Sequence, residues 1–83
     1  KEGLQYFEKE FKKEGIDFIK SSTNFITTCW PSEAIATKIT NNLLKLGVIV
    51  RQLNAFGLSN YIRVSIGLQK ENIQFIKCLK KVL

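Results

Sequence analysis

Two arginines are the residues of this chain best suited by type and position to do chemistry. Arg51 follows the apolar run Val48–Val50, and Arg63 lies in the alternating segment Tyr61–Ile66. The chain has 13 lysines and arginines in total, and all of them except these two are lysines. A planar guanidinium presents a fork of donors that matches two oxygens of a carboxylate or phosphate. Two such forks on neighbouring strands favour a shared anion, and an ordinary surface ion pair for each is the alternative.

Other reactive groups are scarce. The chain has no histidine, and its two cysteines, Cys29 and Cys78, are far apart in the sequence. A zinc site therefore has too few ligands, and a nucleophilic Ser or Cys would have no imidazole base. No glycine pattern typical of a phosphate-binding loop occurs, and the carboxylates form no catalytic pair. We therefore predict no catalytic residue and no metal site, and we expect both cysteines to be reduced thiols, as in a cytoplasmic protein.

Length and composition indicate one small folded domain. The chain has 83 residues, of which 45% are hydrophobic and 24% charged, with one proline. No apolar run approaches the roughly 18–20 residues that a membrane-spanning helix needs. The start, Lys1-Glu2-Gly3-Leu4, is neither an initiator methionine nor a signal peptide, so we expect a piece of a longer protein. The net charge of +6 attracts anions, but its lysines cluster in helical segments, where a solvated surface explains them.

The periodicity of apolar residues predicts three helices and four strands. Helical spacing of Leu4, Phe7 and Phe11 indicates a first helix that stops at Gly15. A second helix is expected from Pro31 and Ser32 to Gly47, with Ile35, Ile39, Leu43 and Leu46 on its apolar face. A third is expected from Lys70 to Leu83, with Ile73, Ile76, Leu79 and Val82/Leu83 facing inward. The expected strands are Ile16–Lys20, Asn24–Trp30, Val48–Leu53 and Tyr61–Ile66, with a loop at Asn54–Asn60.

The order αββαββα favours an α+β fold. We expect an antiparallel or mixed sheet with the helices on one face. In the last strand, Ile62, Val64 and Ile66 share one face, which must meet the core. Arg63 then points away from the helices, where an anion or another surface can meet it. Arg51 is expected at the end of its strand, beside the glycine-containing loop.

Several stretches resemble one enzyme family. They are Gly15-Ile16, Ser22–Phe25, Leu46–Leu53, Phe56–Leu58, Tyr61–Gly67 and Glu71-Asn72. Together they are similar to the C-terminal small domain of the pyridoxal-phosphate aminotransferases of fold type I, and among these to the histidinol-phosphate aminotransferases. The resemblance covers nearly the whole chain.

The resemblance implies a role for each arginine. In most members the arginine matching Arg63 grips the α-carboxylate of the substrate. In the histidinol-phosphate enzymes, Arg63 and Arg51 would hold the substrate phosphate and, in the other half-reaction, the carboxylate of glutamate. The full enzyme would transfer an amino group between L-histidinol phosphate and 2-oxoglutarate in histidine biosynthesis, in the cytoplasm and as a homodimer. Pyridoxal phosphate would be bound by the large domain, so residues 1–83, as the small domain alone, are expected to be inactive.

Two observations leave alternatives open. Leu68-Gln69-Lys70 stand where the family usually has a capping Ser or Thr and then acidic residues. The missing cap predicts a last helix that is less stable by about 0.5–2 kcal/mol. An arginine at position 63 would also suit threonine-phosphate decarboxylase or another aminotransferase. Two alternatives come from other classes of protein. One is a small basic module that binds RNA through Tyr61 and Arg63, and the other is a regulatory or interaction domain with no anion site.

Overall fold

A computed structural model describes residues 2–20, 22, 24–54 and 57–83 of the chain. The elements are α1 (Glu2–Glu14), β1 (Asp17–Lys20), β2 (Phe25–Cys29), α2 (Glu33–Lys45), β3 (Arg51–Leu53), β4 (Leu58–Ser65) and α3 (Gln69–Val82). This is the expected αββαββα order. None of the helices in the described part of the chain has the length and apolar character to cross a membrane.

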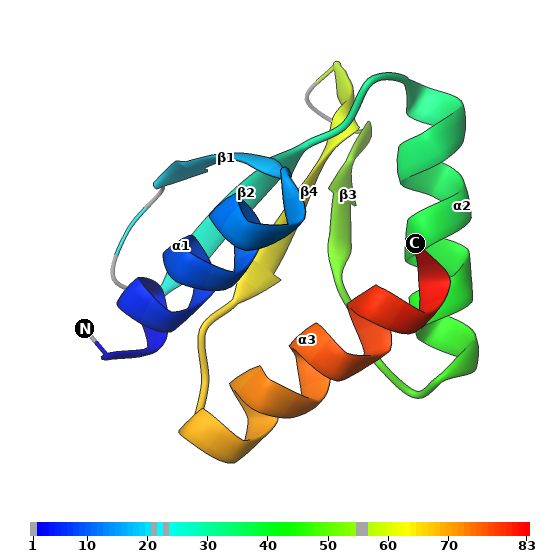
Figure 1. Ribbon diagram of the computed structural model, residues 1–83. Helices are drawn as coiled ribbons and strands as arrows, with labels where there is room; N and C mark the ends of the chain where they lie inside the picture. Colours follow the sequence, from blue (N-terminus) through cyan, green and yellow to red (C-terminus); the bar gives the residue numbers. More distant parts are fainter. Residues whose placement is uncertain (1, 21, 23, 55–56) are drawn as a thin grey trace.

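The four strands form one antiparallel sheet in the order β1-β2-β4-β3. The hairpin β1–β2 lies on one side, and α2 carries the chain across the sheet to β3 at the opposite edge, from which β4 returns to the centre (Figure 1). The central pairing sets Ile26 opposite Val64 and Thr28 opposite Ile62. These side chains therefore share one face of the sheet, and the alternation predicted for β4 is confirmed.

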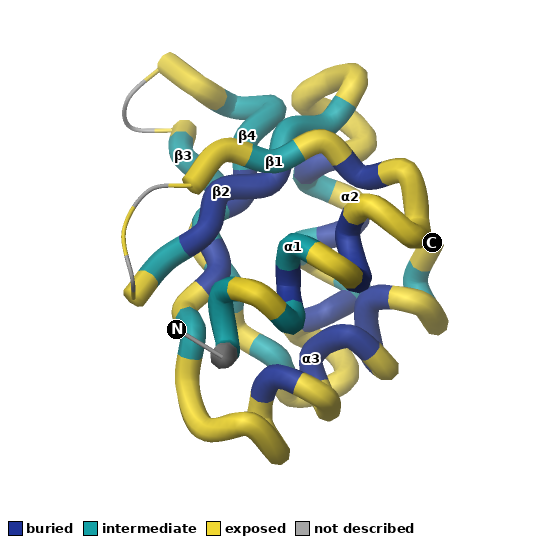
Figure 2. The backbone as a smooth tube through the Cα atoms, turned by 60° about the vertical axis from the view of Figure 1, so that its left-hand side comes forward, coloured by how far each residue is buried: buried dark blue, intermediate teal, exposed yellow. Residues whose placement is uncertain are grey.

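The core lies between that face and the helices. Phe7 and Phe11 of α1 are fully buried and stack with ring centroids 5.5 Å apart, and Phe7 meets Phe75 of α3 edge-on. Ile62 and Val64 of β4 are 2% and 3% exposed. Figure 2 shows the buried segments of α1 and α3 turned towards the sheet. The expected α+β layer with helices on one face is confirmed.

The buried face of α2 differs from the prediction. Ala36, Ile39 and Leu43 are its buried residues, whereas Ile35 and Leu46 are 40% and 45% exposed. Because the helix packs mainly on β4, the small Ala36 permits a close approach that Ile35 would prevent. Ser32 is the N-cap and accepts a bond from the Ile35 amide, so the expected cap is confirmed. Pro31 precedes the cap, so its predicted place in the first turn of the helix is wrong.

The predicted strand Val48–Leu53 is too long. Gly47 has a φ of 82° and ends α2, and the Val48 amide then donates to the Leu43 carbonyl. Such a bond satisfies a carbonyl of the last helical turn, so Val48 belongs to the helix end and not to the sheet. As a result β3 begins only at Arg51. Arg51 lies at the start of its strand, so its predicted place at the strand end beside the loop is wrong.

The other end of that hairpin is longer than predicted. β4 begins at Leu58, so the last three residues of the predicted loop Asn54–Asn60 are strand. The Gly57 φ of 72° lets the chain turn directly before it. Phe56 and Thr23, which belong to stretches that carry the family resemblance, lie outside the described residues.

Side chains inside α3 replace its missing cap. Leu68 makes no side-chain capping bond, as predicted, but its amide donates to Glu71 Oε1 at 2.9 Å. The 2%-exposed Asn72 accepts from the Gly67 amide at 3.0 Å and donates to the Gly67 carbonyl at 3.2 Å. Asn72 thereby ties the end of β4 to α3. The buried apolar residues of α3 are Phe75, Ile76, Cys78 and Leu79, so Ile76 and Leu79 face inward as predicted. Of the predicted pair Val82/Leu83, Val82 packs against the core and Leu83 is 54% exposed. Ile73 is 37% exposed, so its predicted inward position is wrong.

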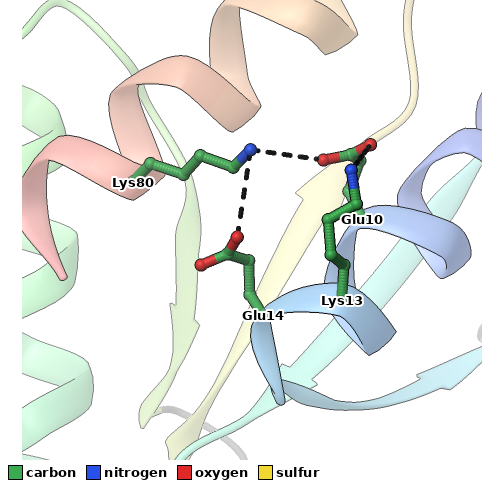
Figure 3. Close-up of polar contacts among 4 residues, drawn as sticks. All are labelled: Glu10, Lys13, Glu14 and Lys80. Carbon is green, nitrogen blue, oxygen red and sulfur yellow. Dashed lines mark ion pairs between the residues drawn. The ribbon is translucent and has the colours of Figure 1, made fainter.

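An ion-pair network joins α1 to α3. Lys80 of α3 reaches Glu10 at 3.5 Å and Glu14 at 3.9 Å, and Lys13 pairs with the same Glu10 (Figure 3). Glu10 is only 8% exposed, so its two lysine partners offset the cost of burying a carboxylate. Burial, and then the Glu10 charge, raise the pKa of the nearby Tyr6 phenol. Four charged residues of the two helices therefore stabilise the packing of α1 against α3.

We expect Phe11→Ala to lower the free energy of unfolding by about 3–5 kcal/mol, because it leaves a cavity beneath α1. Chemical denaturation followed by circular dichroism measures this. The control is Ile49→Ala at an 85%-exposed side chain, which should change stability by less than about 0.5 kcal/mol. Equal losses in both variants would contradict the core described here.

Candidate anion-binding site

The β3–β4 register brings the two arginines together. Arg51 of β3 is the pairing partner of Arg63 of β4. Directly opposite residues on antiparallel strands project from the same face, with Cβ atoms about 4.5–5.5 Å apart. Two long guanidinium side chains that start this close can reach one anion.

The arginine face is the side of the sheet that the helices leave open. Because Ile62 and Val64 are buried on the helix side, Arg63 between them must project from the other side. Arg63 is half-buried and Arg51 is exposed. Ile66, which we expected in the buried row, is half-buried beyond the end of β4.

An aromatic ring lies against Arg63. The Arg63 guanidinium carbon lies over the Phe25 ring, 4.4 Å from its centroid. Phe25 pairs with Ser65, two residues beyond Arg63, so the contact runs diagonally across the β2–β4 ladder. Periodicity in the sequence does not single out Phe25 for function, because only the strand register shows which residue lies beside Arg63.

The arginines are not held by carboxylates. In the part of the chain that the structure describes, every ion pair is made by a lysine. Like charges directly opposite each other in a sheet are destabilising, by roughly 0.2–1 kcal/mol. An anion between Arg51 and Arg63 would remove this repulsion. Among the described residues, the two arginines therefore do not form the separate surface ion pairs that were the alternative.

Gln52 anchors the short strand that carries Arg51. Its side-chain amide donates to Thr37 Oγ1 of α2 at 2.9 Å and to the Ser59 carbonyl of β4 at 2.6 Å. Since β3 has only three residues, these two bonds hold it against both neighbours. Gln52 is thus a positioning residue for Arg51. The sequence shows Gln52 only as a polar residue in a strand, without the partners that explain it.

The open face also carries Cys29, opposite Tyr61 and Asp17. Burial, and then the Asp17 charge, raise the pKa of the Cys29 thiol. A raised pKa lowers the thiolate fraction near neutral pH, so Cys29 is a poor nucleophile. Cys29 and Cys78 are both free thiols, as predicted, although only Cys78 is fully buried.

The arginine pair is not enclosed. A groove lies elsewhere, between Gly47–Ile49 and the first turns of α3, and neither arginine lines it. The described residues contain no cluster of His, Cys, Asp or Glu that could hold a metal. The arrangement can recognise charge through two guanidinium forks.

The chain is a small α+β domain with an arginine pair on one face of its sheet, and its family follows from comparison with known proteins. Residues 1–76 match the family model described as aminotransferase class I and II. The chain therefore belongs to the aminotransferase class I and II family.

Similar curated proteins carry the name histidinol-phosphate aminotransferase. The chain is 41% identical over 81 residues to histidinol-phosphate aminotransferase 2 of Pseudomonas fluorescens, and 39% identical over 83 residues to histidinol-phosphate aminotransferase of Caldicellulosiruptor saccharolyticus. These alignments cover 98% and 100% of the chain but only 21% and 23% of the two enzymes. The chain thus spans about a fifth of the length of these relatives.

A solved structure supports the fold. A crystal structure of a candidate aminotransferase from Burkholderia pseudomallei superposes with a TM-score of 0.83, at 21% identity. The match covers 98% of this chain and 24% of that one. At this identity the likeness concerns the fold alone, and it agrees with the family assignment.

The described residues do not fit the cofactor that the family implies. Class I and II aminotransferases use pyridoxal phosphate in their full-length form. A lysine that binds this cofactor needs a desolvated setting that lowers its pKa. Every lysine in the described ranges is exposed.

We expect Gln52→Leu to lower the free energy of unfolding by about 1–2 kcal/mol, because it removes two hydrogen bonds that hold β3. Amide hydrogen exchange should also become faster at Arg51–Leu53. The exposed Gln5 of α1 provides the control, since Gln5→Leu removes the same amide from a helix surface. Unchanged exchange in β3 would show that Gln52 does not anchor the strand.

Proposed function

We propose that this chain is the C-terminal small domain of a histidinol-phosphate aminotransferase, a piece of a longer enzyme. In that enzyme Arg63 and Arg51 bind the phosphate of L-histidinol phosphate, and the carboxylate of glutamate in the other half-reaction. The full enzyme transfers the amino group between L-histidinol phosphate and 2-oxoglutarate in histidine biosynthesis. The observation that carries the proposal is the pairing of Arg51 with Arg63 on the open face of the sheet.

The electrostatics of the site support an anionic ligand. Two guanidinium groups without carboxylate partners in the described residues leave their donors available for phosphate oxygens, which bidentate bonds match. The family membership favours this hypothesis over the RNA-binding and regulatory alternatives. The names of the relatives favour histidinol phosphate over threonine phosphate.

The rest of the enzyme belongs to the proposal as well. Pyridoxal phosphate and the catalytic lysine are assigned to the large domain, outside this chain, which supplies charge recognition only. A homodimer of the full enzyme stays a prediction. A cytoplasmic location stays a prediction too, supported by the two free thiols.

Phosphate binding by the 83-residue chain tests the arginine pair. We expect inorganic phosphate at pH 7 to shift the side-chain NMR signals of Arg51 and Arg63, and Arg63→Gln to raise the dissociation constant about tenfold or more. Arg51→Gln should weaken binding less, because its side chain is more exposed. Arg63→Lys, which keeps the charge and loses the fork, should fall between wild type and Arg63→Gln.

The control for net charge is Lys45→Gln in the last turn of α2. It lowers the net charge by one, as Arg63→Gln does, at a place away from the sheet face. Weakening of phosphate binding by Lys45→Gln as large as that by Arg63→Gln would mean that the whole molecular charge attracts phosphate. The proposed site would then be wrong.

The substrate assignment is tested in the full-length enzyme. We expect turnover of L-histidinol phosphate with 2-oxoglutarate, and a loss of about tenfold or more in kcat/KM for Arg63→Gln, because the phosphate loses a bidentate partner. The isolated 83 residues with added pyridoxal phosphate should show no turnover. Decarboxylation of threonine phosphate without use of histidinol phosphate would replace the assignment by its closest alternative.

A further inference from the structure

Phe25 is the residue best placed to control the geometry of the anion site. In the β2–β4 ladder, Phe25 pairs with Ser65 and Thr27 pairs with Arg63. Phe25 and Arg63 are therefore diagonal neighbours on the same face, a separation that aromatic and long side chains can bridge. The Arg63 guanidinium carbon lies 4.4 Å from the centroid of the ring, well within the range of a cation–π contact.

A cation–π contact of Arg63 with the ring is compatible with an anion at the hydrogen-bonding edge of the guanidinium. The donors of a guanidinium lie in its plane, so a ring over one face does not compete with an anion at the edge. The ring does restrict the rotation of a side chain that would otherwise be mobile. Arg63 is half-buried and Arg51 is exposed, so one of the two arginines of the pair is held and the other is open to solvent.

We propose that Phe25 is a positioning residue of the anion site, which holds the Arg63 guanidinium ready for its ligand. The inference rests on the proposed function, because it assigns a role towards the same anion. A side chain that is already ordered loses less entropy when the ligand binds, so the ring increases affinity without touching the anion. The negative face of the ring also lies against a cation that faces a second cation, which offsets part of the repulsion between Arg63 and Arg51.

The chain provides a matched set of variants. Phe25→Leu removes the ring and keeps an apolar side chain, whereas Phe25→Tyr keeps the ring on the same open face. Phe18→Leu is the control for losing an aromatic ring from a neighbouring strand, since Phe18 packs against Phe11 with centroids 5.8 Å apart. Unfolding midpoints of all three variants show how much each change affects the fold as a whole.

The Nε–Hε NMR signals of the two arginines report on the contact directly. Protons above a ring face are shielded, so in the wild type we expect the Arg63 signal upfield of the Arg51 signal. Phe25→Leu should move the Arg63 signal towards that of Arg51, while Phe25→Tyr and Phe18→Leu leave it in place. The dissociation constant for inorganic phosphate should rise about two- to fivefold in Phe25→Leu and stay near wild type in Phe25→Tyr.

The NMR signal of Arg63 and the dissociation constant for phosphate test the positioning role and the proposed function separately. An Arg63 signal that does not move in Phe25→Leu overturns the positioning role, whatever happens to phosphate affinity. If Phe18→Leu weakens phosphate binding as much as Phe25→Leu does, the positioning role is also overturned, because losing any aromatic ring near the sheet then has the same effect. A wild-type chain that binds no phosphate overturns the proposed function, and the Arg63 signal then shows by itself whether the ring holds this side chain.

Discussion

Ile62 and Val64 lie at 2% and 3% exposure in the central strand β4, packed beneath the helices. Side chains alternate along a strand, so burying these two residues forces Arg63, between them, to the opposite face. Burial of each of these apolar side chains stabilises the fold by about 1.5–3 kcal/mol, which far exceeds what the arginine would gain on the other face of the sheet. The core therefore determines where the charge goes, and the open face receives a guanidinium whether or not an anion is present.

The second arginine depends on a helix end. The Val48 amide bonds to the Leu43 carbonyl, which keeps Val48 in the terminus of α2 and delays β3 until Arg51. Gln52 then joins β3 to both α2 and β4, and this fixes Arg51 opposite Arg63. The repulsion between the two arginines is tolerated because the strands are held by other contacts. A site that costs stability without its ligand is a common feature of binding proteins.

The open face of the sheet carries two paired arginines. It is open, it has no buried lysine in the described residues, and the chain covers only 21% and 23% of two curated relatives. These facts are consistent with a division of labour in which one part of an enzyme binds the substrate phosphate and another performs the reaction. Phe25 adds rigidity to this recognition, because its ring supports one guanidinium face and leaves the hydrogen-bonding edge available.

Local sequence patterns determined the element order, the one-sided helix layer, the Ser32 cap and the direction of Arg63, since each follows from periodicity or from one residue's preference. They also carried the family resemblance. They misplaced Ile35, Ile73 and the start of β3, because helix rotation and strand length depend on which neighbour each element packs against. Only the tertiary structure brought Phe25 to Arg63 and gave Gln52 its partners in α2 and β4. Their contacts join strands and helices distant in sequence, and such a register is set by packing of the whole sheet and not by any local preference.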